Sequence, residues 1–331
     1  MNILFRCDAH PQVGLGHLGR SIGLAEALRH LGHSCFFLGQ WDDVAQGMLE
    51  DARFTYHEAP SEAGSSEDAR STARLAASLS ASLVADSYSI RMEWVLNPAR
   101  REVPTAMIDD FAALPDYTGC RAVLNFRIGA ERMTYRGLSS ERLATGPGFF
   151  CARDKLRELR DCRTPSKPPW HRILLFLGAS DRHGRAQAIY DALIGQTHPL
   201  EIRVLLSSEA AASFRHRPGE VLILPSRMED HYAWCDACIC GGGLVKYECA
   251  YLGLPVAMFS QTEEQQTDSE IFCAAGWGFN LAPEGDTSSW PDRLALFLQS
   301  ATFPDHLSGG FSSQSPDRSA RHIEHWLGVP N

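Results

Sequence analysis

The sequence predicts an α/β protein with two parallel-sheet domains, and three observations lead to this prediction. Short apolar runs alternate with amphipathic stretches of helical length, which is typical of βαβ units. The alternation starts again in the second half, after a proline-rich stretch at residues 163–169 that suits a linker. A chain of 331 residues also has room for two domains of ordinary size. We therefore expect a first domain over residues 1–162, a linker over residues 163–170 and a second domain over residues 171–331.

The individual strands are expected where a short apolar run is bounded by polar or turn residues. In the first half these runs are residues 3–7, 35–38, 83–86, 106–109 and 122–125. In the second half they are residues 173–177, 202–206, 221–224, 237–240 and 256–259. The tail at residues 308–319 is rich in Ser and Gly, so we expect a loose loop there and a last helix over residues 321–327.

Composition excludes several classes of function. Hydrophobic residues make up 44% and charged residues 21%, which is ordinary for a globular protein. The net charge of −9 argues against nucleic acid as a partner, although a diphosphate can still be held locally by backbone amides and a few arginines. No apolar run is long enough to insert stably in a membrane, and the first residues lack the basic region of a secretion signal. We expect a cytoplasmic protein.

The ten cysteines are scattered along the chain, which predicts reduced thiols and not a disulfide framework. Cys235 and Cys238 have the spacing of half a zinc site. A structural zinc site needs four ligands, and no second pair has a matching spacing. We therefore expect no metal.

The sharpest local motif is Gly14-Leu15-Gly16-His17, which follows the first expected strand and opens a helix. A glycine-rich turn between a strand and a helix brings backbone N–H groups close to a ligand, and the helix N-terminus favours negative charge. His17 lies at this N-terminus, at the carboxyl end of the strands, where open α/β sheets bind ligands. The alternative is a histidine that only caps the helix or packs in the core.

The same glycines, with Gly19, match the spacing of a dinucleotide-binding fingerprint. Two features argue against a nicotinamide or flavin cofactor. The loop between the strand and Gly14 is long, and the next strand ends in residues 36–39 without an acidic residue. We expect no cofactor.

A second glycine turn, residues 241–243, follows the expected strand 237–240. Glu248 lies on the helix behind it, where a carboxylate can accept hydrogen bonds from both hydroxyls of a ribose. Gln265 follows the next strand, where an amide can bind sugar hydroxyls without the cost of a buried charge. The alternative is a simple tight turn with a solvated glutamate behind it.

These motifs together resemble a known family, the hydrolases of pseudaminic acid biosynthesis that act on UDP-2,4-diacetamido-2,4,6-trideoxy-β-L-altropyranose. Its hallmark is Arg-x-Asp followed by Gly-x-Gly-His-x-x-Arg, and residues 85–88 resemble its Asp-x-Tyr strand end. The matching positions are Arg6, Asp8, Gly14, Gly16, His17, Arg20 and Tyr88. The segment 228–248 also resembles the nucleotide-binding segment of MurG-type N-acetylglucosaminyltransferases. The resemblance implies the GT-B architecture, which has two Rossmann-like domains facing a cleft.

The resemblance also implies roles for individual residues. His17 matches the catalytic histidine, and Asp8 is a candidate to orient it. The remaining matched positions would bind a UDP-sugar: the hallmark residues Arg6, Gly14, Gly16, Arg20 and Tyr88, the loop residues Gly178 and Ser180 near the diphosphate, Met228 in the turn that reads uracil, Gly242 and Gly243, Glu248 at the ribose and Gln265 near the sugar.

The functional hypothesis is inverting hydrolysis of a UDP-activated deoxyamino sugar, with His17 as the general base on water. One alternative keeps the site and replaces water by an acceptor hydroxyl, which makes the protein a glycosyltransferase. Another is a nucleotide-sugar-binding module without catalysis, against which His17 argues, since binding alone needs no base.

Overall fold

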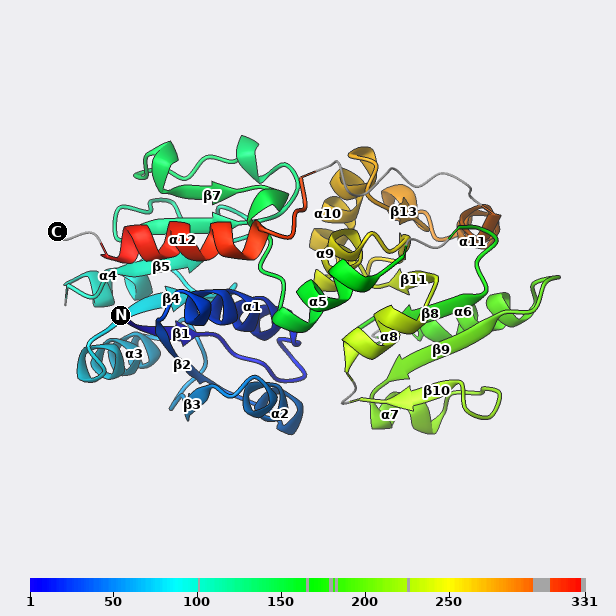
Figure 1. Ribbon diagram of the computed structural model, residues 1–331, viewed down its shortest axis with the longest axis horizontal. Coiled ribbons are helices and arrows are strands. Elements are labelled where there is room, and N and C mark those ends of the chain that lie inside the picture. Colours follow the sequence, from blue (N-terminus) through cyan, green and yellow to red (C-terminus); the bar gives the residue numbers. More distant parts are fainter. Residues whose placement is uncertain are drawn as a thin grey trace. The chain divides into compact units, whose positions relative to one another are not determined.

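The computed structural model describes residues 1–100, 102–164, 167–178, 181, 184–224, 227–299 and 310–328. The chain divides into two compact units, the first made of residues 1–154 and 310–331 and the second of residues 155–309. Each unit is built on one parallel sheet, so the predicted α/β class with two Rossmann-like domains is confirmed (Figure 1).

The sheet of the first unit has the strand order β3-β2-β1-β4-β5-β6-β7, and all its pairs are parallel. Its strands are β1 (Asn2–Arg6), β2 (Ser34–Gly39), β3 (Thr55–Glu58), β4 (Ala81–Ala85), β5 (Thr105–Ile108), β6 (Ala122–Asn125) and β7 (Leu143–Thr145). Its α-helices are α1 (Gly16–His30), α2 (Asp43–Asp51), α3 (Ser66–Ser78), α4 (Met92–Arg100) and α12 (Ser315–Gly328). The order reverses between β1 and β4, which places a ligand-binding switch point at their carboxyl ends.

Both faces of this sheet are buried, because helices cover each of them. Leu4, Leu83 and Met107 belong to a core that also contains Ala69 of α3 and Trp94 of α4. The alternate strand residues, such as Ile3 and Phe5, are also fully buried. Helices α1 and α12 pack side by side (Figure 1). Continuous apolar strands are the expected pattern for a parallel sheet that is covered on both faces.

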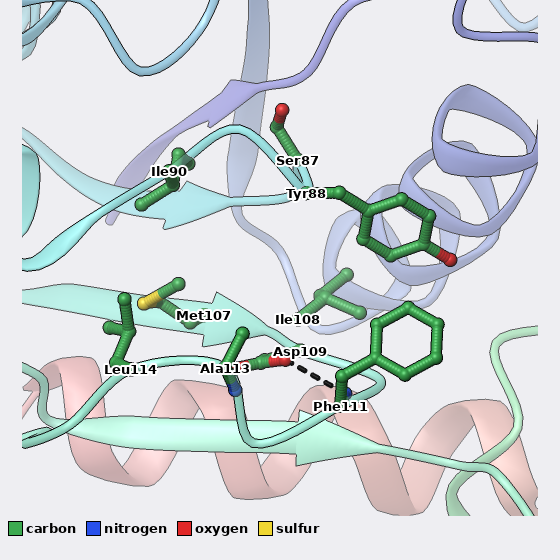
Figure 2. A pocket seen from close by; sticks show the side chains of 9 residues that line it. All are labelled: Ser87, Tyr88, Ile90, Met107, Ile108, Asp109, Phe111, Ala113 and Leu114. Atoms are coloured by element: carbon green, nitrogen blue, oxygen red, sulfur yellow. Dashed lines mark hydrogen bonds between the residues drawn. The ribbon is translucent and has the colours of Figure 1, made fainter. Parts of the chain in front are cut away.

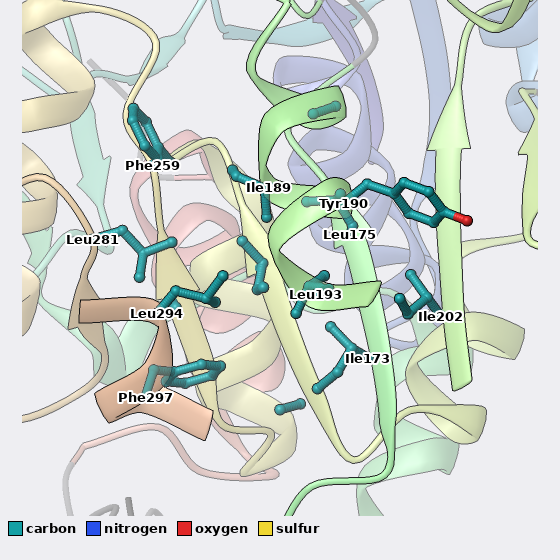
Figure 3. Close-up of a cluster of buried hydrophobic side chains, with 14 of the residues drawn as sticks. Ile173, Leu175, Ile189, Tyr190, Leu193, Ile202, Phe259, Leu281, Leu294 and Phe297 are labelled. Carbon is teal, nitrogen blue, oxygen red and sulfur yellow. The ribbon is translucent and has the colours of Figure 1, made fainter. Parts of the chain in front are cut away.

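The sheet of the second unit has the order β10-β9-β8-β11-β12-β13 and is also parallel. Its strands are β8 (Arg172–Phe176), β9 (Glu201–Leu206), β10 (Val221–Ile223), β11 (Ala237–Cys240), β12 (Val256–Met258) and β13 (Phe279–Asn280). Its helices are α5 (Asp154–Cys162), α6 (Arg185–Ile194), α7 (Ser208–Ala212), α8 (Met228–Trp234), α9 (Leu244–Leu252), α10 (Glu263–Ala274) and α11 (Trp290–Gln299). Ile189 and Leu193 of α6 and Phe297 of α11 pack on Ile173 and Leu175 of β8 (Figure 3).

The expected domain boundaries differ from the observed units at both ends. The chain enters the second unit at Lys155, before the proline-rich stretch, because α5 is tied to it: Arg163 at its end donates to the carbonyls of Tyr232 and Cys235. The last helix, expected in the second domain, belongs to the first unit. It is also longer than residues 321–327, since it begins at Ser315 and carries Pro316 in its first turn, a position that proline favours.

Candidate functional site

The first candidate site lies where the carboxyl ends of β1, β4 and β5 meet. His17 is the second residue of α1, Asp86 directly follows β4, and Asp110 comes two residues after β5. The three side chains are buried, at 7%, 1% and 4% exposure respectively. The sheet topology therefore brings together groups that are far apart in the sequence.

Asp86 is the residue that orients His17. Its Oδ1 lies 2.6 Å from Nδ1 of His17. Burial alone would raise the pKa of Asp86, but the charge of Arg20 and the hydrogen bonds from Arg20 and His17 outweigh burial and hold the pKa below its ordinary value. An ionised Asp86 can only accept, so this short contact requires Nδ1 of His17 to donate to it. Arg20 Nη2 also lies 3.1 Å from Nδ1, but its closer partner is Asp86 Oδ1 at 2.6 Å. In the neutral imidazole, a proton on Nδ1 leaves the lone pair on Nε2, which is the atom able to take a proton.

Arg20 holds this arrangement in place, which differs from its expected role as a substrate-binding residue. Its Nε and Nη2 donate to the two oxygens of Asp86 at 2.8 and 2.6 Å, and its Nη1 donates to Oδ2 of Asp110 at 2.6 Å. It is only 4% exposed. Since two carboxylates already occupy the guanidinium, the role of Arg20 is to hold Asp86 and Asp110 in place.

Asp8 does not orient His17, so this expectation is corrected. Its carboxylate pairs with Arg6 and accepts the backbone N–H groups of Gln40 and Ala63, both at 2.9 Å. Arg6 is fully buried, and its Nε donates to Asp68 at 2.6 Å. The Arg-x-Asp motif therefore joins the loops after three strands, and neither residue is available to a substrate.

The remaining predicted residues of the first unit border His17. Gly14 has a φ of +84°, which favours glycine, and a side chain there would meet open space. Gly16 is the first residue of α1, whose N-cap Leu15 makes no side-chain capping bond. Tyr88 packs edge-on against His17, with 4.4 Å between the ring centroids, and its hydroxyl donates to Asp110.

A small pocket opens beside Tyr88. Its lining residues are mostly apolar, with Ser87 and Asp109 as polar exceptions, and Figure 2 shows the rings of Tyr88 and Phe111 together at one side of it. Asp109 accepts the backbone N–H groups of Phe111 and Ala113 at 2.9 and 3.1 Å, so its carboxylate shapes the loop. Asp86, Asp110 and Phe111 were not predicted as site residues.

The second candidate site is the glycine turn after β11, in which the three glycines differ. A Cβ on Gly241 would lie 2.1 Å from the carbonyl oxygen of Leu177, and one on Gly242, at a φ of +83°, would lie 2.9 Å from Ser269 Oγ. A Cβ on Gly243 would meet only Nε2 of Gln265, at 3.8 Å. Gly241 and Gly242 are required by packing, whereas Gly243 leaves open space.

Buried polar groups hold this turn from behind. Lys246 is fully buried, and its Nζ donates to the carbonyl of Gly242 and to Asp268, the latter at 2.7 Å. Gln265 accepts the backbone N–H of Gln261 through Oε1 at 2.9 Å, so its amide nitrogen is the end that faces Gly243. Lys246 was not predicted, although a lysine inside a helix of otherwise buried residues is a detectable signal.

Glu248 is buried at 5% exposure, so a solvated glutamate is excluded. Its Oε2 accepts the hydroxyl of Tyr232 at 2.6 Å. Met228, the residue expected beside uracil, is the first residue of α8. Gly178 follows β8 with a φ of +116° and open space around it, while Ser180 lies outside the described residues.

The described residues contain no group of three or more His, Cys, Asp or Glu side chains that could hold a metal ion. All ten cysteines are free, and burial raises the pKa of Cys120 and Cys151 to about 12. Within the described part of the chain, no helix combines the length and apolar character needed to cross a membrane.

Comparisons with known proteins place the fold. No family model matches the chain, and no curated protein sequence does. Among solved structures, the spinosyn rhamnosyltransferase SpnG complexed with thymidine diphosphate has a TM-score of 0.61 at 17% identity, covering 98% of this chain and 96% of that one. MurG of Acinetobacter baumannii has a TM-score of 0.57 at 13% identity, covering 99% and 98%. The UDP-GlcNAc 2-epimerase of Neisseria meningitidis bound to UDP-GlcNAc has 0.59 at 10% identity, covering 99% of both chains.

At such identities the likeness establishes the fold alone. It is the GT-B fold of glycosyltransferases, as the sequence resemblance implied. The narrower resemblance to hydrolases of pseudaminic acid biosynthesis stays a prediction.

Proposed function

We propose that this protein is an enzyme that binds a nucleotide-diphosphate sugar and displaces the nucleotide from the anomeric carbon, with His17 as the general base. The observation that carries the proposal is the hydrogen bond between His17 and the ionised Asp86. It fixes the proton on Nδ1 and leaves Nε2 to accept one. Simple binding of a sugar nucleotide needs no such pair.

In the hydrolytic form of the reaction, water attacks the anomeric carbon while its proton passes to Nε2 of His17. The bond between the anomeric carbon and the diphosphate oxygen breaks, and the nucleoside diphosphate leaves with the bonding electron pair. Attack opposite the leaving group inverts the anomeric configuration. Asp86 stabilises the imidazolium that forms, and Arg20 keeps Asp86 ionised.

The nucleotide is assigned to the second unit. Gly243 offers open space at the start of α9, and the amide of Gln265 faces it as a neutral donor. Backbone N–H groups at the N-terminus of α9 suit a diphosphate. Glu248 is the proposed ribose acceptor, Gly178 and Ser180 are proposed for the diphosphate and Met228 for the base. UDP is the proposed nucleotide, in keeping with the resemblance of residues 228–248 to MurG.

Transfer to an acceptor hydroxyl is the second candidate, and the fold comparison favours it. SpnG is a rhamnosyltransferase, and CalG4, with a TM-score of 0.61, is a calicheamicin glycosyltransferase. The geometry of His17 serves either nucleophile. Hydrolysis of a deoxyamino sugar in a pseudaminic-acid-type pathway remains the narrower proposal from the sequence.

Incubation with a panel of UDP-activated deoxyamino sugars, followed by mass spectrometry, separates the candidates. Release of UDP and free sugar without an acceptor supports hydrolysis, and release only after an acceptor is added supports transfer. Binding without turnover in either condition contradicts an enzyme. The His17→Asn variant is the control, because it must lose release in whichever condition the wild type shows it.

A further inference from the structure

Two exposed aromatic rings lie beside the proposed base. Tyr88 is 53% exposed and Phe111 is 38% exposed, although both are large apolar side chains. Their ring centroids are 5.1 Å apart, and Tyr88 also contacts the imidazole of His17. They come from the loops after β4 and β5 and stand together beside the pocket (Figure 2). Exposed apolar rings at a site indicate a ligand that covers them.

Asp110, the neighbour of Phe111, holds an unused hydrogen-bond acceptor. Oδ2 accepts both Arg20 Nη1 and the Tyr88 hydroxyl, each at 2.6 Å. Oδ1 is buried and has no hydrogen-bond partner within the described part of the chain. Burial would raise the pKa of Asp110, but Arg20 outweighs it and lowers the pKa, so the oxygen is charged. Leaving such an oxygen unpaired costs free energy, which a ligand donor would recover.

We infer that Tyr88, Phe111 and Asp110 form the subsite for the pyranose ring of the nucleotide sugar. The two aromatic rings pack against the apolar face of the pyranose, and Asp110 Oδ1 accepts a hydrogen bond from one hydroxyl or N–H on that ring. Tyr88 is half-exposed, and its hydroxyl donates to the other oxygen of the same carboxylate, so the rings and Asp110 Oδ1 belong to one connected group of side chains.

This inference rests on the proposed function, because the ring in question is the one attacked at its anomeric carbon. Proximity favours that ring over a more distant part of the substrate, since Tyr88 touches His17. The diphosphate does not fit this position, because the unpaired Oδ1 of Asp110 is an acceptor and phosphate oxygens have no hydrogen to donate to it. A nucleobase could stack on the rings, but its site is already assigned to the second unit.

The decisive variant is Asp110→Asn. The amide oxygen is expected to stay with Arg20 and Tyr88, which are both donors, so the NH₂ group takes the place of Oδ1. A donor then faces the ligand. The wild type and the variant are compared on UDP-sugars that each lack one ring hydroxyl or amino substituent. In the wild type, removal of the substituent that Asp110 binds should lower kcat/KM about 5–150-fold. In Asp110→Asn, removal of that same substituent should change kcat/KM by no more than a few-fold. Removal of any other substituent should lower kcat/KM by the same factor as in the wild type.

Phe111→Ala provides an independent measurement, because it leaves Asp110 in place. It should raise the KM for the UDP-sugar about tenfold and leave the Kd for UDP alone unchanged. The matched control is Ile194→Ala at the end of α6, a residue with 36% exposure, which should change neither constant.

Each outcome is decisive. The inference is overturned if every deoxy analogue loses the same factor in the wild type and in Asp110→Asn. It is also overturned if Phe111→Ala changes only the KM of a separate acceptor, because the rings then bind that acceptor. If the wild type binds no UDP-sugar and turns none over, the proposed function fails first, and this result differs from both others.

Discussion

The two candidate sites are both loops at the carboxyl ends of parallel strands, yet they differ in the charge of the groups that form them. Around His17 the groups are ionised and buried: Asp86 and Asp110 share Arg20. Around Gly243 the facing groups are uncharged, and Lys246 is paired with Asp268 behind the turn. A base needs fixed charges to set its tautomer, whereas a diphosphate needs open space and N–H donors. The first site is therefore suited to proton transfer, and the second is suited to holding a ligand.

The His17→Asn substitution tests whether the first site acts in the chemical step. If His17 acts only in the chemical step, turnover should fall about 10²–10⁴-fold, which is typical for the loss of a general base. Affinity for the UDP-sugar should stay within a few-fold, because the interaction is made mainly in the transition state. Steady-state kinetics and calorimetric titration measure the two effects. Near wild-type turnover, with the acidic limb of the pH–rate profile intact, would contradict the mechanism.

Glu248→Gln tests nucleotide binding at the second candidate site. The amide can still accept the Tyr232 hydroxyl, so the fold should persist, but the charged acceptor for the ribose is lost. UDP affinity should weaken by about 1–3 kcal/mol. Tyr232→Phe is the control, since it removes the hydrogen bond that Glu248→Gln retains and keeps the carboxylate, so its UDP affinity should stay near that of the wild type. Equal UDP affinities for Glu248→Gln and the wild type would remove Glu248 from the ribose site.

Two glycines of the second turn are expected to differ in what they contribute, one to ligand binding and the other to folding. Gly243→Ala should fold like the wild type, because its Cβ meets nothing closer than 3.8 Å, and should weaken UDP binding about tenfold by occupying ligand space. Gly242→Ala should instead destabilise the fold by about 1–2 kcal/mol, because its φ is +83°. Thermal unfolding and UDP titration of both variants are the measurement. Loss of stability in Gly243→Ala, with unchanged affinity, would make this glycine structural.

The smallest effect on turnover and binding is expected at Glu26, which lies outside both sites. It is 8% exposed and accepts the backbone N–H of Asp154, and burial raises its pKa from 4.5 to about 7. The folded state therefore binds more protons than the unfolded state between these pH values, so stability falls as pH rises through this window and levels off above it. Glu26→Gln should remove this slope, which amounts to about 3 kcal/mol across the window, without changing turnover. A wild-type denaturation midpoint that rises from pH 5 to pH 8 would contradict this assignment.

The central strands could be predicted from sequence because each is a buried apolar run. The strands that escaped prediction are β3, β7 and β13, which lie at sheet edges. Edge strands need no continuous apolar run; β3, for example, has no fully buried residue. The short length of β13 adds to the difficulty.

The site could be predicted only in part. His17 was identified because a glycine turn before a helix is a local signal. Its partner Asp86 is 69 residues away, and only the pairing of β1 with β4 brings the two together. Asp8 is closer in the sequence, but its carboxylate is paired with the buried Arg6. Nearness along the chain favoured the wrong aspartate, because sheet topology and not sequence distance decides which side chains meet.

The packing of α12 on α1 has a consequence for biosynthesis. The ribosome delivers α1 early and α12 only after the whole second unit has been made. Until then the nascent first unit exposes the surface that Ile323 and Leu327 will cover. The second unit, in contrast, has all its strands in one continuous segment and can complete its sheet as it emerges. The unit that carries His17 is therefore completed last, because α12 follows the whole second unit in the sequence.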